Sequence, residues 1–172
     1  MNIVEITSKE LFASELADKQ EIIIDADSLI LGRLASIVAK LTRLGIRVHV
    51  VNIEKAVLTG ERKRVIEGYK LLFEVKTHRN PYRQAIHRPR HPISLFKRTV
   101  RNMLPKNINR KLRLIRLVKA YVGIPQEFEG KTAYKLVDIS INSSEHAKKR
   151  PRDIVTLAEL AKAMGWNPRG AT

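Results

Sequence analysis

Residues 21–52 place a strand, a helix and a second strand in direct succession, and this unit limits the kind of sheet that the chain can form. The apolar run Glu21–Asp25 is typical of a buried strand. Within Gly32–Leu44 the apolar residues recur at helical spacing, and Gly45 is placed to end the helix. Arg47–Asn52 is a second apolar run. A strand, helix and strand in this order predict a parallel βαβ unit in a sheet with covered faces.

The rest of the chain is compatible with one domain and two appendages. Its 172 residues are 44% hydrophobic, which is enough for a substantial core. We expect an N-terminal extension at 1–20, an α/β domain at 21–142, and a basic C-terminal extension with a short helix at 143–172. Periodicity further predicts helices at 8–17, 61–73, 93–104, 108–117 and 156–164, strands at 56–59, 118–122 and 134–141, and helix caps at Ser8 and Thr156.

The segment Val75–Gln126 contains no acidic residue, although the chain has 17 of them. It holds 14 of the 33 lysines and arginines, and the formal net charge of the chain is +16. Such a segment cannot neutralise itself, so its charge predicts an external polyanion. A solvated charged face is the ordinary interpretation of surface cations, but it does not explain so many of them without one acid. We therefore predict a nucleic-acid-binding surface.

The basic segment has a structure that suits RNA. Thr77–Pro92 contains three prolines, which predict a stiff loop in which arginines alternate with Pro, Tyr and His. Arginine binds phosphate with two hydrogen bonds, and Tyr82 can stack on an unpaired base. The two helices that follow add cations on a rigid frame. The candidate RNA contacts are Lys63, Arg79, Tyr82, Arg83, Arg88, Arg90, Lys97, Arg98, Arg101, Lys106, Arg110, Lys111 and Arg113.

The sequence gives little support for an enzymatic function or a bound cofactor. The turn at 25–32 lacks the glycines that let a backbone approach a pyrophosphate, and no Gly-Lys-Ser/Thr loop occurs. His87 and His91 have no carboxylate or cysteine nearby to complete a metal site. Asp25 and Asp27 lie among turn residues, where capping is the expected role. We therefore predict no catalytic residue, no metal, no cofactor and no small-molecule substrate.

Other features of the sequence indicate the cellular compartment of the protein. The chain has no cysteine, which excludes disulfides and thiolate metal sites and allows a reducing interior. Its apolar runs are too short to span a bilayer, and Glu5 lies where a signal peptide would be positive. We expect a cytoplasmic protein that does not bind membranes.

Five segments, taken in order, resemble the family of ribosomal protein thirteen of the large subunit. They are Ile24–Asp27, Leu31–Ser36, Val51–Gly60, Phe96–Pro105 and Lys119–Pro125. The short link from Leu44 to Arg47 and the ending from Thr156 to Trp166 are similar to the archaeal branch.

The resemblance implies a three-layer α/β/α fold around a small, mostly parallel sheet, with the basic proline-rich loop and terminal extensions attached. It implies binding to large-subunit ribosomal RNA early in assembly, neighbouring large-subunit ribosomal proteins as further partners, and no catalysis. By this resemblance Arg33 joins Lys97, Arg98 and Arg101 as an RNA contact.

The sequence departs from the family at two positions. Asn102 and Asn109 stand where the family usually has glycine, which questions any close approach of the backbone to RNA there. Two alternatives from other classes remain: a Rossmann-like enzyme acting on RNA or nucleotides, and a nonspecific DNA-compacting protein. The first requires convergent carboxylates or a glycine turn, and the second requires comparable binding to duplex DNA.

Overall fold

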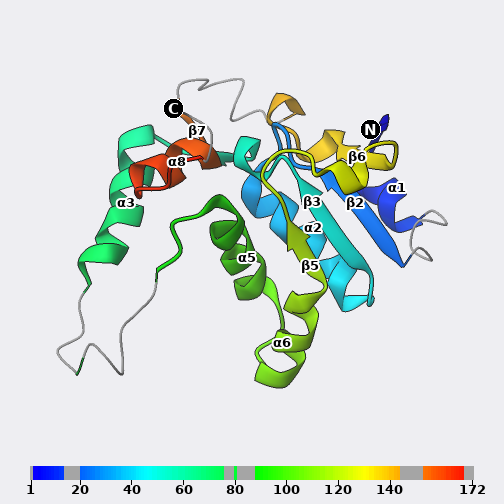
Figure 1. Cartoon of the computed structure of the whole chain (residues 1–172), viewed down its shortest axis with the longest axis horizontal. Coiled ribbons are helices and arrows are strands. Elements are labelled where there is room, and N and C mark those ends of the chain that lie inside the picture. The colour runs from blue at the N-terminus through cyan, green and yellow to red at the C-terminus, as the bar shows by residue number, and fades with distance from the viewer. Residues whose placement is uncertain (1, 14–19, 76–79, 81–87, 144–152, 169–172) are drawn as a thin grey trace.

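The computed structural model describes residues 2–13, 20–75, 80, 88–143 and 153–168. Its centre is a five-stranded sheet in the order β1-β6-β2-β3-β5, in which all neighbouring strands are parallel (Figure 1). The strands are β1 (Asn2–Ile6), β2 (Glu21–Asp25), β3 (Arg47–Val51), β5 (Val118–Ala120) and β6 (Thr132–Leu136). The register of β2 on β3 runs from Glu21 opposite Arg47 to Asp25 opposite Val51. The predicted βαβ unit is therefore confirmed.

Helices and a small second sheet surround these strands. The α-helices are α1 (Ser8–Ala13), α2 (Leu31–Arg43), α3 (Arg62–Glu74), α5 (Pro92–Met103), α6 (Ile108–Arg116) and α8 (Leu157–Ala163). The 3-10 helices are η2 (Ile53–Lys55), η3 (Gln126–Phe128), η4 (Val137–Ile139) and η5 (Ile141–Ser143). The second sheet consists of β4 (Val57–Thr59) and β7 (Ile154–Thr156), which pair antiparallel.

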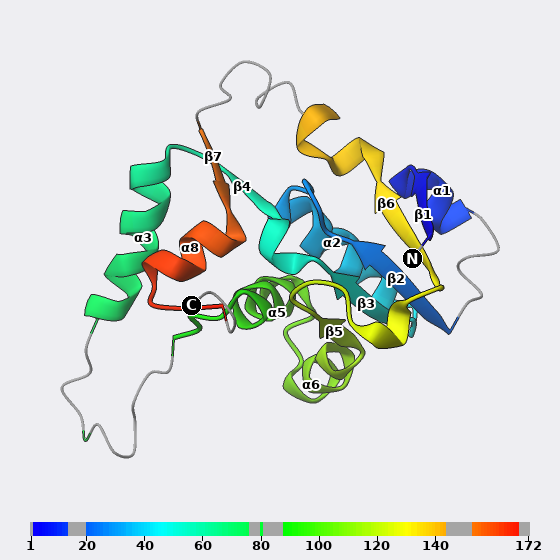
Figure 2. The ribbon, with the colours of Figure 1, turned by 45° about the horizontal axis from the view of Figure 1, so that its top comes forward.

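The two faces of the main sheet are covered unequally. On one face α2 and α5 lie side by side (Figure 2). Phe96 of α5 is completely buried in the main core. The other face carries a smaller cluster in which Phe128 of η3 packs near Ile23 and Val51. Helices thus flank a small parallel sheet, and the predicted α/β fold class is confirmed.

Helix α3 packs only partly against this core, through Val65, Ile66, Tyr69 and Phe73. None of its residues is buried, and its neighbours are α8 and β7 of the C-terminal segment (Figure 2). The guanidinium of Arg90 lies 5.0 Å from the ring centre of Phe73, and the rings of His91 and Trp166 meet edge to face at 5.4 Å. These contacts place the segment before α5 between α3 and the C-terminal segment.

The structure corrects several sequence-based boundaries. Strands β1 and β7 were not expected, and the strand predicted at 134–141 runs over 132–136, after which the chain turns into η4. The cap of α1 is Thr7 rather than Ser8: Thr7 Oγ1 accepts from the Glu10 amide at 3.3 Å, and Glu10 Oε2 accepts from the Thr7 amide at 2.8 Å. Ser8 instead donates its hydroxyl to the carboxylate of Asp138.

Other local expectations are met. Thr156 Oγ1 accepts from the Glu159 amide at 3.2 Å and caps α8 as predicted. The second half of the helix expected at 8–17 and most of the proline-rich loop lie outside the described residues. The division of the chain at residues 20 and 142 stays a prediction, and β1 and α8 both pack on the α/β domain.

Candidate nucleic-acid interface

Helix α5 carries three of the predicted RNA contacts on a rigid frame. It begins with Pro92 at its first position, and the His91 Nδ1 atom accepts from the Ile93 amide at 3.3 Å. Its apolar side, with Leu95, Phe96 and Val100, is buried against the core. Because the helix is amphipathic, Lys97, Arg98 and Arg101 are left on the opposite side.

Helix α6 continues this basic surface. Asn107 Oδ1 accepts from the Arg110 amide at 3.3 Å and caps the helix. Leu114 and Ile115 pack partly against the core, but no residue of α6 is fully buried. The helix therefore holds its cations at the surface beside α5.

A cleft of about 740 Å³ lies between these helices and the segment before α5. We call this cleft the basic groove. Its five cations are Arg88, Lys97, Arg98, Arg101 and Lys111, and its other lining residues are Pro89, Ser94, Asn102, Leu112 and Ile115. Among the described residues, no carboxylate lines it. The groove thus presents donors of hydrogen bonds and positive charge to any anion that enters.

No ion pair between described residues involves a cation of the basic groove. Within the described ranges, ion pairs join Arg47 to Glu21 at 3.1 Å, Arg64 to Glu61 at 2.9 Å and Lys135 to Asp27 at 3.7 Å. All six residues lie outside the acid-free segment.

The remaining predicted contacts lie outside the groove. Arg33 is exposed on the first turn of α2, and Lys63 is exposed on α3. Lys106, Arg110 and Arg113 are exposed in or next to α6. Arg90 covers the ring of Phe73 as described above. Arg79, Tyr82 and Arg83 lie outside the described residues.

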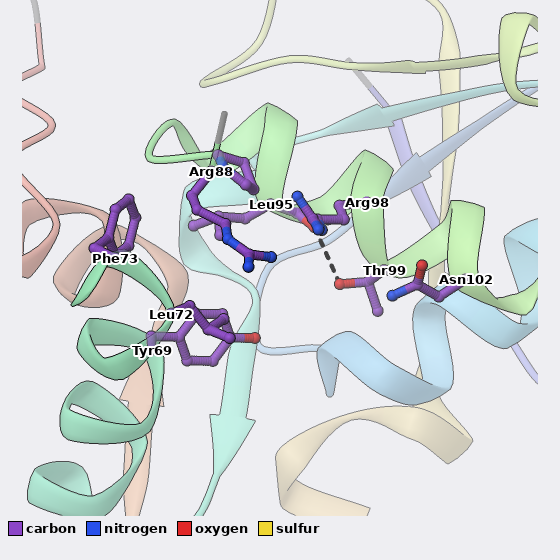
Figure 3. Close-up of a pocket in the computed structure, with 9 residues that line it drawn as sticks. Tyr69, Leu72, Phe73, Arg88, Leu95, Arg98, Thr99 and Asn102 are labelled. Carbon is purple, nitrogen blue, oxygen red and sulfur yellow. Dashed lines mark hydrogen bonds between the residues drawn. The ribbon is translucent and has the colours of Figure 1, made fainter. Parts of the chain in front are cut away.

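A second, smaller cavity of about 180 Å³ adjoins the groove between α3 and α5 (Figure 3). We call it the aromatic cavity. It is lined by Tyr69, Leu72 and Phe73 from α3, by Leu95, Arg98, Thr99 and Asn102 from α5, and by Arg88 and Pro89 from the segment before α5. Burial raises the pKa of the Tyr69 hydroxyl, which therefore remains a hydrogen-bond donor at neutral pH. The sequence indicated an apolar side of α3 but not that this side would border the basic segment.

At the carboxyl ends of β2 and β3, two buried polar side chains pair with each other. Asn52 donates to Asp25 Oδ1 at 2.9 Å, and both side chains are buried. Asp25 also accepts from the Asp27 amide at 3.2 Å, and neither residue caps α2, whose N-cap is Ile30 without a side-chain hydrogen bond. Asn52 adopts a left-handed conformation with a φ of 54°.

Neither a metal-binding cluster nor a membrane-spanning helix occurs in the described part of the chain. No group of three or more His, Cys, Asp or Glu side chains could hold a metal ion there. No helix in that part has both the length and the apolar character needed to cross a membrane.

The two asparagines that replace the usual glycines lie in ordinary helix. Asn102 is in α5 and Asn109 in α6, and among the described non-glycine residues only Ser28 and Asn52 have a positive φ. Neither position therefore requires the special backbone freedom of glycine. The Asn102 side chain instead lines both the groove and the aromatic cavity.

Comparison with known proteins identifies the family. Residues 19–127, which span β2 to η3 and include α5 and α6, match the family described as Ribosomal protein L13. The chain is 47% identical to large ribosomal subunit protein uL13 of Sulfolobus acidocaldarius over 87% of this chain and 96% of that protein. It is 46% identical to the protein of the same description from Saccharolobus solfataricus, over 90% and 99% of the two chains. The counterpart in Methanococcus maripaludis is 33% identical over 84% and 97%. The chain therefore belongs to the ribosomal protein L13 family.

Proposed function

We propose that this protein is a structural, non-catalytic constituent of the large subunit of the cytoplasmic ribosome. It binds large-subunit ribosomal RNA, and the basic groove is its principal contact. Further partners are neighbouring ribosomal proteins, and no small-molecule substrate is involved. The names of its relatives, which are large ribosomal subunit proteins, support this assignment.

The observation that carries the proposal is the composition of the groove. Five cations from α5, α6 and the segment before α5 line one cleft without a carboxylate. Arginine and lysine in this arrangement neutralise the phosphates of a backbone that runs along the cleft. The field of the remaining acid-free segment extends the attraction beyond the groove.

The cations outside the groove have separate roles in this proposal. Arg33, Lys63, Lys106, Arg110 and Arg113 are exposed and contact phosphate around the rim of the interface. Arg79, Tyr82 and Arg83 contact RNA from the proline-rich loop. The side chain of Arg90 already packs on Phe73, so its contribution to RNA binding is the smallest of the set.

Cofractionation tests the proposal directly. The native protein is followed through a sucrose gradient of a lysate of the organism that encodes it, at low and at high monovalent salt. We expect it in the large-subunit peak at low salt, with release as salt rises, because phosphate contacts weaken as counterions are restored. A protein that sediments free at low salt would refute the ribosomal assignment.

A binding assay separates ribosomal RNA from DNA. The purified full-length chain is titrated with a large-subunit ribosomal RNA transcript and with duplex DNA of equal phosphate concentration. Tighter binding to the RNA is expected. Equal affinities would favour a nonspecific DNA-compacting protein instead.

A further inference from the structure

The aromatic cavity differs from the rest of the interface because it is small and largely apolar. At about 180 Å³ it is smaller than the roughly 300 to 1,000 Å³ of sites that hold whole small molecules. The rings of Tyr69 and Phe73 approach it from α3, while Thr99 and Asn102 approach it from α5 (Figure 3). A flat group that enters between the helices would therefore meet aromatic side chains on the α3 side.

One polar atom in this cavity lacks a partner. The Nε atom of Arg88 is buried and makes no hydrogen bond within the described part of the chain. Figure 3 shows its guanidinium group between the side chains of α3 and those of α5. Because the Nε atom is itself buried, a ligand in the cavity meets the guanidinium group of Arg88, which donates hydrogen bonds and favours a ligand that brings an acceptor.

The cavity adjoins the basic groove. Arg88, Arg98 and Asn102 line both spaces. A chain of phosphates bound in the groove therefore passes the mouth of the cavity, where a base attached to it can turn inward.

We propose that the aromatic cavity binds one unstacked base of the ribosomal RNA whose phosphates lie in the basic groove. The base stacks on the aromatic side chains of α3, and its edge accepts hydrogen bonds from the Arg88 guanidinium group and the Tyr69 hydroxyl, with Asn102 at the mouth. This inference rests on the proposed function and adds a site that reads a base rather than the backbone.

A base fits these observations better than an apolar side chain of a neighbouring protein. A leucine or phenylalanine would fill the apolar part but would offer no acceptor to the Arg88 guanidinium group. A base edge supplies nitrogen and oxygen acceptors, and its face suits the rings. The cations at the shared border would also attract a polyanion ahead of an apolar partner.

The test compares two cavity variants with a control on the same helix. Tyr69→Ala removes one ring, and Thr99→Trp fills the cavity from α5. Leu71→Ala is the control, because Leu71 is exposed on α3 and does not line the cavity. Affinity for a full-length large-subunit ribosomal RNA transcript is measured over a range of salt concentrations.

We expect both cavity variants to bind roughly 5- to 150-fold more weakly, as for the loss of one base-stacking contact. Their salt dependence should equal that of the wild type, because no phosphate contact is removed. The control should bind like the wild type. Unchanged affinity in both cavity variants would overturn the inference.

Crosslinking of the unmodified protein gives a readout that needs no variant to fold. Irradiation of the wild-type complex at short ultraviolet wavelength should attach a nucleotide to the peptide that contains Tyr69 and Phe73. Crosslinks confined to other peptides would reject the base site. Normal RNA binding by the variants, combined with failure to join the large subunit, would assign the cavity to a protein partner and equally reject it.

The results that would refute the proposed function differ from those that would refute the base site. If the wild-type chain does not bind the transcript, or binds without salt dependence, then the ribosomal RNA interface itself is refuted. If the wild type binds with a steep salt dependence and only the cavity results are negative, the base site alone is refuted.

Discussion

Neutralising the exposed side of α5 should weaken RNA binding without weakening the fold. The variant replaces Lys97, Arg98 and Arg101 by glutamine, which forms helix about as well as lysine and arginine do. The three side chains line the basic groove and take part in none of the ion pairs between described residues. The folded state therefore loses no described salt bridge when they are removed.

The size of the effect follows from the number of groove cations. If each of the five contacts one phosphate, the log–log slope of affinity against salt is about −3.5 to −4.5. With three removed, the slope should fall in magnitude to about −1.4 to −1.8. If the two proteins bind equally at about 1 M salt, this difference in slope corresponds at about 0.1 M salt to a loss of affinity of about 100- to 500-fold.

The assay is filter binding or fluorescence anisotropy with a large-subunit ribosomal RNA transcript at several salt concentrations. The matched control replaces Lys9, Arg43 and Lys162 by glutamine; these are exposed on α1, α2 and α8 and do not line the groove. Both variants lose three positive charges, so any difference between them reports position rather than net charge. Thermal unfolding of both should remain close to that of the wild type, since exposed substitutions usually change stability by about 0.5 kcal/mol or less.

Two results would refute this reasoning. An unchanged slope in the groove variant would mean that α5 does not contact phosphate. Equal losses in the two variants would mean that overall charge governs binding and that the groove has no special role.

Three further predictions concern the fold. Replacing the completely buried Phe96 by alanine should lower the free energy of unfolding by about 3 to 5 kcal/mol in denaturant titration, and Phe96→Leu should cost clearly less; equal costs would contradict the packing argument. Asn52→Gly should cost about 1 to 3 kcal/mol by removing the side-chain donor of buried Asp25, which then keeps only the Asp27 amide among the described residues. Asn52→Ala should cost about 1 kcal/mol more than Asn52→Gly because of its positive φ, and the reverse order of Tm values would reject the assignment. Burial lowers the pKa of His49 from its usual 6.5, so the unfolded chain binds this proton more readily than the folded one, and stability should fall as pH drops below about 6.5. His49→Gln should flatten that part of the profile of Tm against pH, and an unaltered profile would exclude His49 as its source.

Local sequence signals were sufficient to predict an element when it is amphipathic or when its packing partners are close to it in sequence. Strands β2 and β3 are apolar runs joined by a periodic helix, and this pattern predicts their parallel pairing. The stop of α5 before Pro105 and the cap at Thr156 follow from backbone chemistry alone. These features need no knowledge of distant contacts.

Strands β1 and β7 could not be recognised in this way, because distant partners stabilise them. Four of the five residues of β1 are exposed, so it shows little hydrophobic pattern, and its hydrogen bonds go to β6 about 130 positions later. Strand β7 has three residues and pairs with β4 across almost a hundred positions. Such strands form because they pair with strands that are distant in sequence. Local propensity does not encode that pairing.

The candidate site was predictable in kind but not in arrangement. The absence of acids in Val75–Gln126 was enough to predict a polyanion partner. It did not show that Lys111 of α6 would share a groove with α5, nor that Arg90 would cover Phe73. The partners of these side chains come from helices that are distant in sequence, and only the packing of those helices brings them together.

Helix α5 explains why a chain with this charge can still fold around its interface. Its buried side contributes Leu95, Phe96 and Val100 to the core, and burial of such side chains is worth about 1.5 to 3 kcal/mol each. That gain offsets the mutual repulsion of the cations on its other side, which no described acid relieves within the groove. Because one helix carries both sides, the position of the groove is set by the hydrophobic core rather than by the RNA. The groove is then organised before RNA binds, and its cations lose little freedom on binding.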